Sequence, residues 1–324
     1  MTSAPEGAST RLRGLGDLEL IVVTGKGGVG KSTMAAGIAE ALHRSGKSVL
    51  LCDIEAGSGA AQAFELDPLS FTPTEIRPGF SAMAMDTEAS LREYLKIYLR
   101  IPIIGKISPL AKAFDFVATA APGVREVLTV GKLCYEVRER HYDVVVVDAP
   151  SSGYVTSLLN APETIQALAQ VGLIRSQTDW MLEILHDQQR TGVVCVTTPE
   201  EMPVTETMEL LDRLAEQTAV APSLIVANRV LPESFNLRER EAFDALTAAR
   251  GLAAVKTSAG ELGLSALSLA RAVEGIRRQR MAQLGDLLEG IGDLDIALIP
   301  ELFAVPSGLR MTSLIADALI EELT

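Results

Sequence analysis

Short apolar runs alternate with longer amphipathic stretches along most of the chain. The short runs are rich in Val, Ile and Leu at consecutive positions, as in parallel strands that are covered on both faces. In the longer stretches apolar residues recur every three or four positions, as on one face of a helix. This alternation predicts an α/β fold with a doubly wound, mostly parallel sheet. The predicted strands span 18–23, 48–53, 80–85, 142–148, 192–198, 222–228 and 295–299, and helices are expected at 34–42, 200–219, 241–249, 262–288 and 312–323.

Two further helical blocks flank the strand at 142–148, one at about 87–140 and one at about 155–190. Together they predict a helical subdomain inserted into a single domain that spans 17–324. Their apolar faces could form a surface for another molecule, or they could simply cover the sheet and each other. Residues 1–16 are rich in Ser, Gly and Ala and lack an apolar core, which predicts a flexible tail and not a signal peptide.

The composition indicates a soluble protein with a substantial core. Of the 324 residues, 48% are hydrophobic, which argues against long disordered regions. The formal net charge of −13 disfavours nucleic acid and anionic lipid as main partners, because both need clustered Lys and Arg. No apolar run approaches the roughly 18–20 residues of a membrane span, so no stable membrane anchor is expected. These features predict a cytoplasmic protein.

A glycine-rich stretch, TGKGGVGKST, joins the first predicted strand to the first predicted helix. It fits G-x4-G-K-[ST], the phosphate-binding loop (P-loop), in the strand–loop–helix context that this loop requires. Backbone N–H groups of such a loop point into one concavity, and the following helix adds the positive end of its dipole. Lys31 would reach the β- and γ-phosphates, and the Ser32 hydroxyl would bind Mg²⁺. We therefore predict a site for ATP or ADP with Mg²⁺, formed by Gly25, Lys26, Gly27, Gly28, Val29, Gly30, Lys31, Ser32 and Thr33.

Lys26 is an additional lysine directly after the first glycine of this loop. The loop therefore resembles the deviant Walker A motif, G-K-G-G-x-G-K-[ST], of a group of dimeric ATPases. In that group the early lysine reaches the nucleotide of the partner subunit, where a cation can neutralise charge that develops on the transferred phosphoryl group. The resemblance predicts that Lys26 is catalytic and that hydrolysis is coupled to dimer closure. The alternative is a solvated lysine on a loop.

Acidic residues close two of the predicted strands. Asp53 ends one strand, with Glu55 two residues later, and Asp148 ends another strand after four valines. Ligands of open parallel sheets lie beyond the carboxyl ends of the strands, so these acids should face the phosphates. Asp148 matches the Walker B aspartate that assists Mg²⁺. Of Asp53 and Glu55, one would suit the metal shell and the other the attacking water; alternatively, they only cap their loop.

Two further strand ends offer contacts for the nucleotide base. Asn228 and Arg229 follow one strand, and the asparagine amide could read the edge of adenine. Pro300 and Leu302 follow the last strand and could form a wall beside the base. Either pair could instead serve only the fold.

Together these features resemble the ArsA-type ATPases, the family of the arsenite-pump ATPase and of the tail-anchored-protein targeting factor. The likeness runs from about residue 18 to the C-terminus. Residues 109–132 and the D-x-E sequence at Asp53 look closest to the actinobacterial branch of the family. The matching segments are the deviant P-loop, Asp53-Ile54-Glu55, Asp148-Ala149-Pro150, the turn Thr198-Pro199-Glu200 and Asn228-Arg229.

This resemblance implies a P-loop ATPase that uses Mg²⁺, carries a helical subdomain and dimerises through its nucleotide face. Glu55 would take the place of the acid that orients the attacking water, and Lys26 would act on the partner's nucleotide. The implied catalytic residues are thus Glu55, Lys26 and Asp53, and the implied metal ligands are Ser32, Asp53 and Asp148.

Three departures from the family pattern bear on this reading. The acid at position 55 is more often an aspartate in an Asp-Pro-Ala sequence, so Glu55 affects the expected rate of hydrolysis. Tyr154 stands where the family usually has a histidine. The cysteines of an arsenite site and of a zinc-clasped dimer are missing, because Cys52, Cys134 and Cys195 lie far apart in the sequence. Arsenite transport is therefore not expected, and other contacts must hold any dimer.

As a whole, the sequence predicts a dimeric Mg-ATPase whose nucleotide state opens and closes a surface for a client or partner protein. The second subunit could be identical or a paralogue, and the helical blocks raise the hypothesis of a hydrophobic client. Two alternatives stay open: a scaffold that binds nucleotide with little hydrolysis, and a partition- or division-site ATPase acting at DNA or a membrane. Against the second, residues 307–324 contain Arg310 and no lysine, which makes a poor anchor for an anionic membrane.

Overall fold

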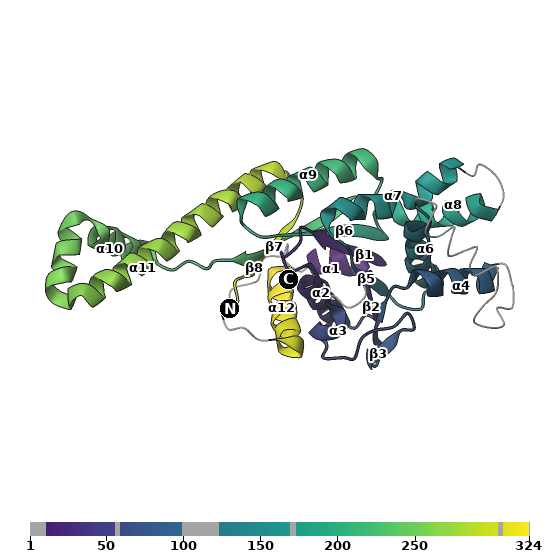
Figure 1. Ribbon diagram of the computed structural model, residues 1–324, viewed down its shortest axis with the longest axis horizontal. Helices are drawn as coiled ribbons and strands as arrows, with labels where there is room; N and C mark the ends of the chain where they lie inside the picture. The colour runs from purple at the N-terminus through teal and green to yellow at the C-terminus, as the bar shows by residue number, and fades with distance from the viewer. Residues whose placement is uncertain (1–10, 56–58, 99–122, 169–172, 304–306, 324) are drawn as a thin grey trace, which may run out of the picture.

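The computed structural model describes residues 11–55, 59–98, 123–168, 173–303 and 307–323 (Figure 1). Within these residues the strands form one sheet that is parallel except for its edge strand β3, which pairs antiparallel with β4. The predicted doubly wound, mostly parallel sheet is therefore confirmed. The strand order is β3 (Thr74–Arg77), β4 (Phe80–Ala84), β2 (Val49–Asp53), β5 (Val144–Asp148), β1 (Leu20–Gly25), β6 (Thr191–Thr197), β7 (Pro222–Val230) and β8 (Ile296–Pro300).

Helices cover both faces of the sheet, and a separate set of buried apolar side chains fills the space on each face. One layer contains α1 (Arg11–Asp17), α2 (Lys31–Arg44), α3 (Ala60–Ala63) and α12 (Gly308–Leu323). The other layer contains α6 (Val124–Arg138), α7 (Ser152–Leu168) and α9 (Glu201–Gln217). Because both faces are covered, β1, β2, β5 and β6 are buried along their whole length, which explains why their sequences are apolar at successive positions.

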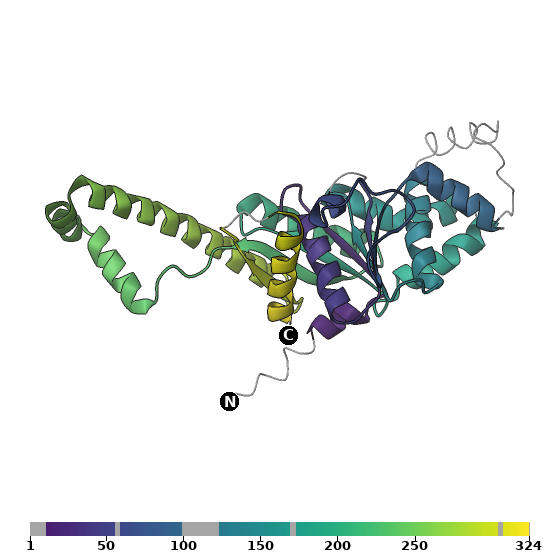
Figure 2. The ribbon, with the colours of Figure 1, turned by 90° about the horizontal axis from the view of Figure 1, so that it is seen from below.

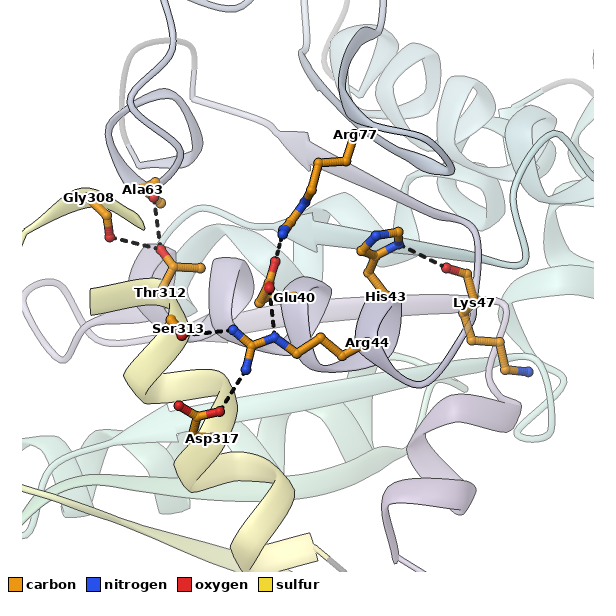
Figure 3. A network of polar contacts seen from close by, with 10 residues as sticks. All are labelled: Glu40, His43, Arg44, Lys47, Ala63, Arg77, Gly308, Thr312, Ser313 and Asp317. Atoms are coloured by element: carbon orange, nitrogen blue, oxygen red, sulfur yellow. Dashed lines mark hydrogen bonds and ion pairs between the residues drawn. The ribbon is translucent and has the colours of Figure 1, made fainter. Parts of the chain in front are cut away.

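A cluster of polar side chains fastens α12 to α2, the helix that follows the P-loop (Figure 3). Glu40 of α2 is buried and accepts hydrogen bonds from Arg44, at 2.7 Å, and from Arg77 of β3. The Arg44 guanidinium also donates to Asp317 and Ser313 of α12, at 2.6 and 2.8 Å. Helix α12 is thereby held against the helix that directly follows the P-loop.

Helices α4 (Thr87–Tyr98), α6, α7 and α8 (Leu173–Leu185) gather at one end of the molecule, on the right in Figures 1 and 2. Helix α6 contacts the other three, and α7 contacts α8. We propose that this group is the helical subdomain expected from the sequence. The part of the predicted helical block at 99–122 lies outside the described residues. Of the helices that are described, none is both long enough and apolar enough to cross a bilayer.

The connection between β7 and β8 forms a helical arm at the opposite end of the molecule. Helices α10 (Leu237–Thr247) and α11 (Ala249–Gly290) extend away from the sheet, on the left in Figures 1 and 2. Gly260 interrupts the helical backbone of α11 with φ 63° and ψ −157°, so the helix changes direction there. The sequence predicts helices at 241–249 and 262–288 but not their projection, because a pattern of apolar positions does not show what covers them.

Three short elements, α1, α3 and β3, are absent from the elements predicted from the sequence. Residues 11–16 belong to α1, whereas the sequence predicts a flexible tail over 1–16; the structure buries Leu15, and α1 contacts α12. Strand β3 is not predicted because it lies at the edge of the sheet and its side chains are exposed or half-buried. Such a strand needs no run of apolar residues.

Candidate functional site

The P-loop runs from the end of β1 to the start of α2. Gly30, directly before α2, has φ 97°, in the left-handed region that favours glycine. A Cβ at this position would lie 2.6 Å from Nδ2 of Asn228, so the space also requires glycine. No described side chain caps the N-terminus of α2. No capping side chain of the described residues therefore occupies the first backbone N–H groups of the helix, which suits the binding of a phosphate.

Asn228, at the carboxyl end of β7, braces this loop. Its buried side chain donates from Nδ2 to the Val29 carbonyl at 2.8 Å, and its Oδ1 accepts from the backbone N–H of Arg229 at 2.8 Å. The sequence offers Asn228 as a reader of adenine, and the contact with the P-loop backbone is a role that sequence reasoning misses. The amide nitrogen carries two hydrogens, so the brace and a contact to a base are compatible.

Two carboxylates from neighbouring strands lie beside the P-loop. Asp53 ends β2 and Asp148 ends β5, and the two residues are direct partners in the parallel register. Asp148 also pairs with Val23 of β1, the strand that leads into the loop. The Ser32 hydroxyl forms a hydrogen bond with the Asp148 carboxyl group. The structure thus brings together Ser32, Asp53 and Asp148, the residues named from the sequence as metal ligands.

The electrostatic environment of Asp148 is unusual for a carboxylate. Burial raises its pKa from 3.8 to about 6, and the charges of Asp53 and Glu55 add to this effect. The Ser32 hydrogen bond and the charge of Lys31 act in the opposite direction. In the described part of the chain, the buried Oδ2 of Asp148 has no hydrogen-bond partner. A buried carboxylate oxygen in this condition is suited to a cation.

The oxygen atoms of Ser32, Asp53 and Asp148 suit a Mg²⁺ ion that is shared with a nucleotide better than a metal ion that is held by protein side chains alone. Mg²⁺ prefers oxygen ligands and is usually held by one or two carboxylates together with substrate phosphates and water. Among the described residues, no group of three or more His, Cys, Asp or Glu side chains could hold a metal ion. Ser32 and Asp148 would therefore hold the ion on the protein side, with Asp53 next to them.

Glu55 is exposed in the bend that follows β2, two residues beyond Asp53. Further along the same loop, Gly59 approaches Ser32 so closely that a Cβ would lie 2.0 Å from the serine Cβ. The Gly59 N–H donates to Oδ2 of Asp53 at 3.4 Å. Gly59 therefore lies against the corner that Ser32 and Asp53 form. Sequence reasoning misses Gly59, because glycine in a loop indicates only freedom of the backbone.

Both lysines of the P-loop contact groups of this same chain. The Lys26 ammonium lies 2.6 Å from Oε1 of Glu206 on α9. The Lys31 ammonium donates to the Lys26 carbonyl at 3.3 Å. Sequence reasoning misses Glu206, because it is one of several acidic residues on the solvent-accessible side of α9.

The residues expected near the base lie at adjacent strand ends. Arg229 is exposed with φ 59° at the end of β7, and Pro300 ends the neighbouring strand β8. Leu302 is half-buried against the core. Arg280 of α11 contacts the Arg229 carbonyl at 3.5 Å and the Glu301 carboxylate at 3.6 Å. The helical arm thus connects the ends of β7 and β8.

Tyr154 connects the loop after Asp148 to the helical subdomain. It lies in the first turn of α7, and its hydroxyl donates to Oε1 of Glu126 on α6 at 2.6 Å. Burial, reinforced by this hydrogen bond, raises the pKa of Tyr154 far above its usual range, so the hydroxyl stays protonated and donates. The charge of Glu55 acts in the same direction on the pKa of Tyr154.

An apolar cavity of about 300 Å³ lies among α4, α6, α7 and α8. Residues of α6 on both sides of Glu126 in the sequence, such as Val124 and Val127, contribute to its wall, so the cavity and the Tyr154 contact share one helix. The apolar side chains of the lining include Leu91, Val127, Leu128, Ile165, Trp180 and Met181.

Comparison with known proteins matches most of this architecture to one family. A profile of the ArsA family, described as anion-transporting ATPase, matches residues 18–179 and 164–249. ATPase BagA of Mycobacterium tuberculosis is 37% identical over 229 residues, which cover 67% of each chain. An ATPase ASNA1 homolog of Cryptosporidium parvum is 27% identical over 246 residues, 66% of each chain. ATPase get3 of Schizosaccharomyces japonicus is 29% identical over 188 residues, 57% of this chain and 55% of that protein. The higher identity to the mycobacterial protein agrees with the predicted likeness to the actinobacterial branch.

Proposed function

Because this chain belongs to the ArsA family of anion-transporting ATPases, we propose that it is a dimeric, Mg²⁺-dependent ATPase whose nucleotide state controls a surface for a partner protein. The observation that carries the proposal is the meeting of Ser32 with Asp148, whose buried Oδ2 has no hydrogen-bond partner in the described chain. Such a polar corner, next to a glycine loop and an uncapped helix N-terminus, suits a polyphosphate with its metal.

The roles proposed for individual residues follow from their places around the loop. Lys31 would bind the β- and γ-phosphates, and the loop N–H groups would bind the remaining phosphate oxygens. Ser32 and Asp148 would hold Mg²⁺, which supplies charge neutralisation at the phosphates. Glu55, exposed beside Asp53, would orient the attacking water. Lys26 would act on the nucleotide of the second subunit, either an identical chain or a paralogue.

The apolar cavity favours a hydrophobic client as the partner. Its walls come from α6 and three neighbouring helices, and α6 is tied to the first turn of α7 by the Tyr154–Glu126 hydrogen bond. A change in the loop after Asp148 on nucleotide binding would therefore move or release α6. In this proposal, nucleotide binding and client binding are coupled through Tyr154, in a protein that works in the cytoplasm.

Turnover of ATP, measured together with association state, tests the proposal. Wild type should release phosphate, Lys31→Ala should fall to background, and Glu55→Gln should still dimerise with ATP while turning over at least about 100-fold more slowly. Lys26→Ala should bind ATP but hydrolyse it slowly. Lys256→Ala, on the exposed arm, is the matched control and should behave as wild type.

Other outcomes would favour the alternatives. Phosphate release by wild type that equals that of Lys31→Ala, with ATP binding intact, would indicate a nucleotide-binding scaffold. Co-sedimentation with DNA or anionic vesicles that depends on ATP would indicate a partition- or division-site ATPase.

A further inference from the structure

Strand β1 leads into the P-loop, strand β6 leads into α9, and these two strands are neighbours in the sheet. Gly25, at the end of β1, pairs with Val196 near the end of β6, and α9 begins four residues after β6 ends. The second turn of α9 therefore lies beside the P-loop. It is this placement that allows Glu206 to reach Lys26, although 180 positions separate them in the sequence.

The contact between the two side chains is close but accessible to solvent. Lys26 Nζ and Glu206 Oε1 are 2.6 Å apart, and the side chains are 28% and 31% exposed. The backbone of Lys26 is held as well, because the Lys31 ammonium donates to its carbonyl oxygen. In the structure, the Lys26 ammonium is thus directed toward a carboxylate of its own chain.

We propose that Glu206 is a positioning residue that holds Lys26 against its own subunit until a second copy of the chain presents a triphosphate. The proposal rests on the function proposed above, in which Lys26 acts on the partner's nucleotide. An exposed pair of single charges is weak, so the triphosphate of ATP can displace the Glu206 carboxylate. ADP carries less charge and competes less well, so the pair adds a cost to dimer closure that ATP overcomes more readily than ADP.

Replacing Glu206 by Gln keeps the shape of the side chain and removes its charge. Lys26 is then free to reach the partner's phosphates without first losing an ion pair. Breaking one Lys26–Glu206 pair lowers the association constant of the dimer by about twofold to fivefold, and two pairs break in each dimer. The dimer dissociation constant with a non-hydrolysable ATP analogue and Mg²⁺ should therefore fall about fourfold to 25-fold in Glu206→Gln. Because the same pair must break on closure with either nucleotide, the dimer dissociation constant with ADP should fall by the same factor.

The experiment measures dimerisation by analytical ultracentrifugation and nucleotide affinity by calorimetry on the full chain. The variants are wild type, Glu206→Gln, Lys26→Ala, the double variant, and Glu209→Gln. Glu209 is an exposed acid on the same helix and serves as the matched control, which should not change either quantity. The effect of Glu206→Gln should disappear when Lys26 is Ala, because the carboxylate acts only through that lysine.

Three results would overturn the proposal: an unchanged dimer in Glu206→Gln, a weaker dimer, or an effect that persists in the double variant. The affinity measurement separates this failure from that of the ATPase assignment. If wild type bound no nucleotide, the proposed function itself would be wrong. If it bound nucleotide and dimerised but Glu206→Gln had no effect, only the role of Glu206 would be wrong.

Discussion

At the scale of single residues, Asp148 combines burial with charge in a way that lowers stability. Burial raises its pKa to about 6, so the folded protein binds this proton more tightly than the unfolded chain does. Protonation of Asp148 therefore favours the folded state. This contribution to stability is fully present below the unfolded pKa of about 4 and is lost as the pH rises through about 6. Near neutral pH the ionised carboxylate therefore destabilises the fold when no cation compensates its charge. A buried carboxylate that destabilises the fold near neutral pH suits a role in binding a cation better than a role in folding.

Asp148→Asn should make the protein more stable in the presence of a chelator. The expected gain in the free energy of unfolding at pH 7 is about 1–3 kcal/mol. At pH 5 the gain should be smaller by about 1 kcal/mol, because wild-type Asp148 is then largely protonated. Urea denaturation at the two pH values measures both quantities.

Asp143→Asn supplies a control of opposite sign in the same experiment. Hydrogen bonds from the backbone and hydroxyl of Ser48 lower the pKa of Asp143, so its stabilising effect is present at neutral pH and is lost in acid. Its replacement should therefore destabilise at pH 7. An Asp148→Asn variant that is less stable than wild type at both pH values would show that Asp148 serves the fold.

At the scale of elements, α6 stands between the nucleotide site and the apolar cavity. The Tyr154 hydroxyl joins the start of α7 to Glu126 of α6, and the same α6 lines the cavity with Val127 and Leu128. Loss of one hydroxyl should therefore uncouple the two sites without removing either. Coupling of this kind typically changes affinity by about 5–150-fold.

Tyr154→Phe should leave ATP binding intact and remove the influence of ATP on client capture. A photocrosslinker at position 128 and an apolar transmembrane-segment peptide provide the measurement. In wild type the yield of adduct should change at least about fivefold with Mg-ATP, and in Tyr154→Phe it should not change. Tyr142→Phe, at the other end of β5, is the matched control. If wild type formed no adduct with or without ATP, the hydrophobic client would be excluded for this peptide.

At the scale of the whole molecule, local patterns in the sequence predict the sheet and the phosphate loop well. Buried parallel strands such as β5 appear as apolar runs, and the P-loop is contiguous, so both can be read without knowing the fold. The contacts that complete the site are different. Asn228 contacts Val29, which is 199 positions away in the sequence, and Glu206 contacts Lys26, which is 180 positions away. A local sequence pattern cannot reveal contacts between residues so far apart in the sequence.

The same limit applies to the shape of the molecule. The helices predicted at 241–249 and 262–288 overlap α10 and α11, but the first half of α11 and the projection of both helices as an arm are not predicted, because the projection depends on what the chain leaves uncovered. Tyr154 is visible in the sequence only as a departure from a family pattern. Its partner Glu126 becomes known only when α6 and α7 are seen side by side.

Binding of Mg-ATP at the P-loop is the property on which turnover, dimer closure and control of a partner surface all depend. Isothermal calorimetry of the full chain with Mg-ATP measures it most directly, with Lys31→Ala and a titration in EDTA as comparisons. We expect saturable binding of about one nucleotide per chain, weakened at least about tenfold by Lys31→Ala and also weakened without Mg²⁺. Absence of saturable heat, or equal affinity in wild type and Lys31→Ala, would contradict the proposed site.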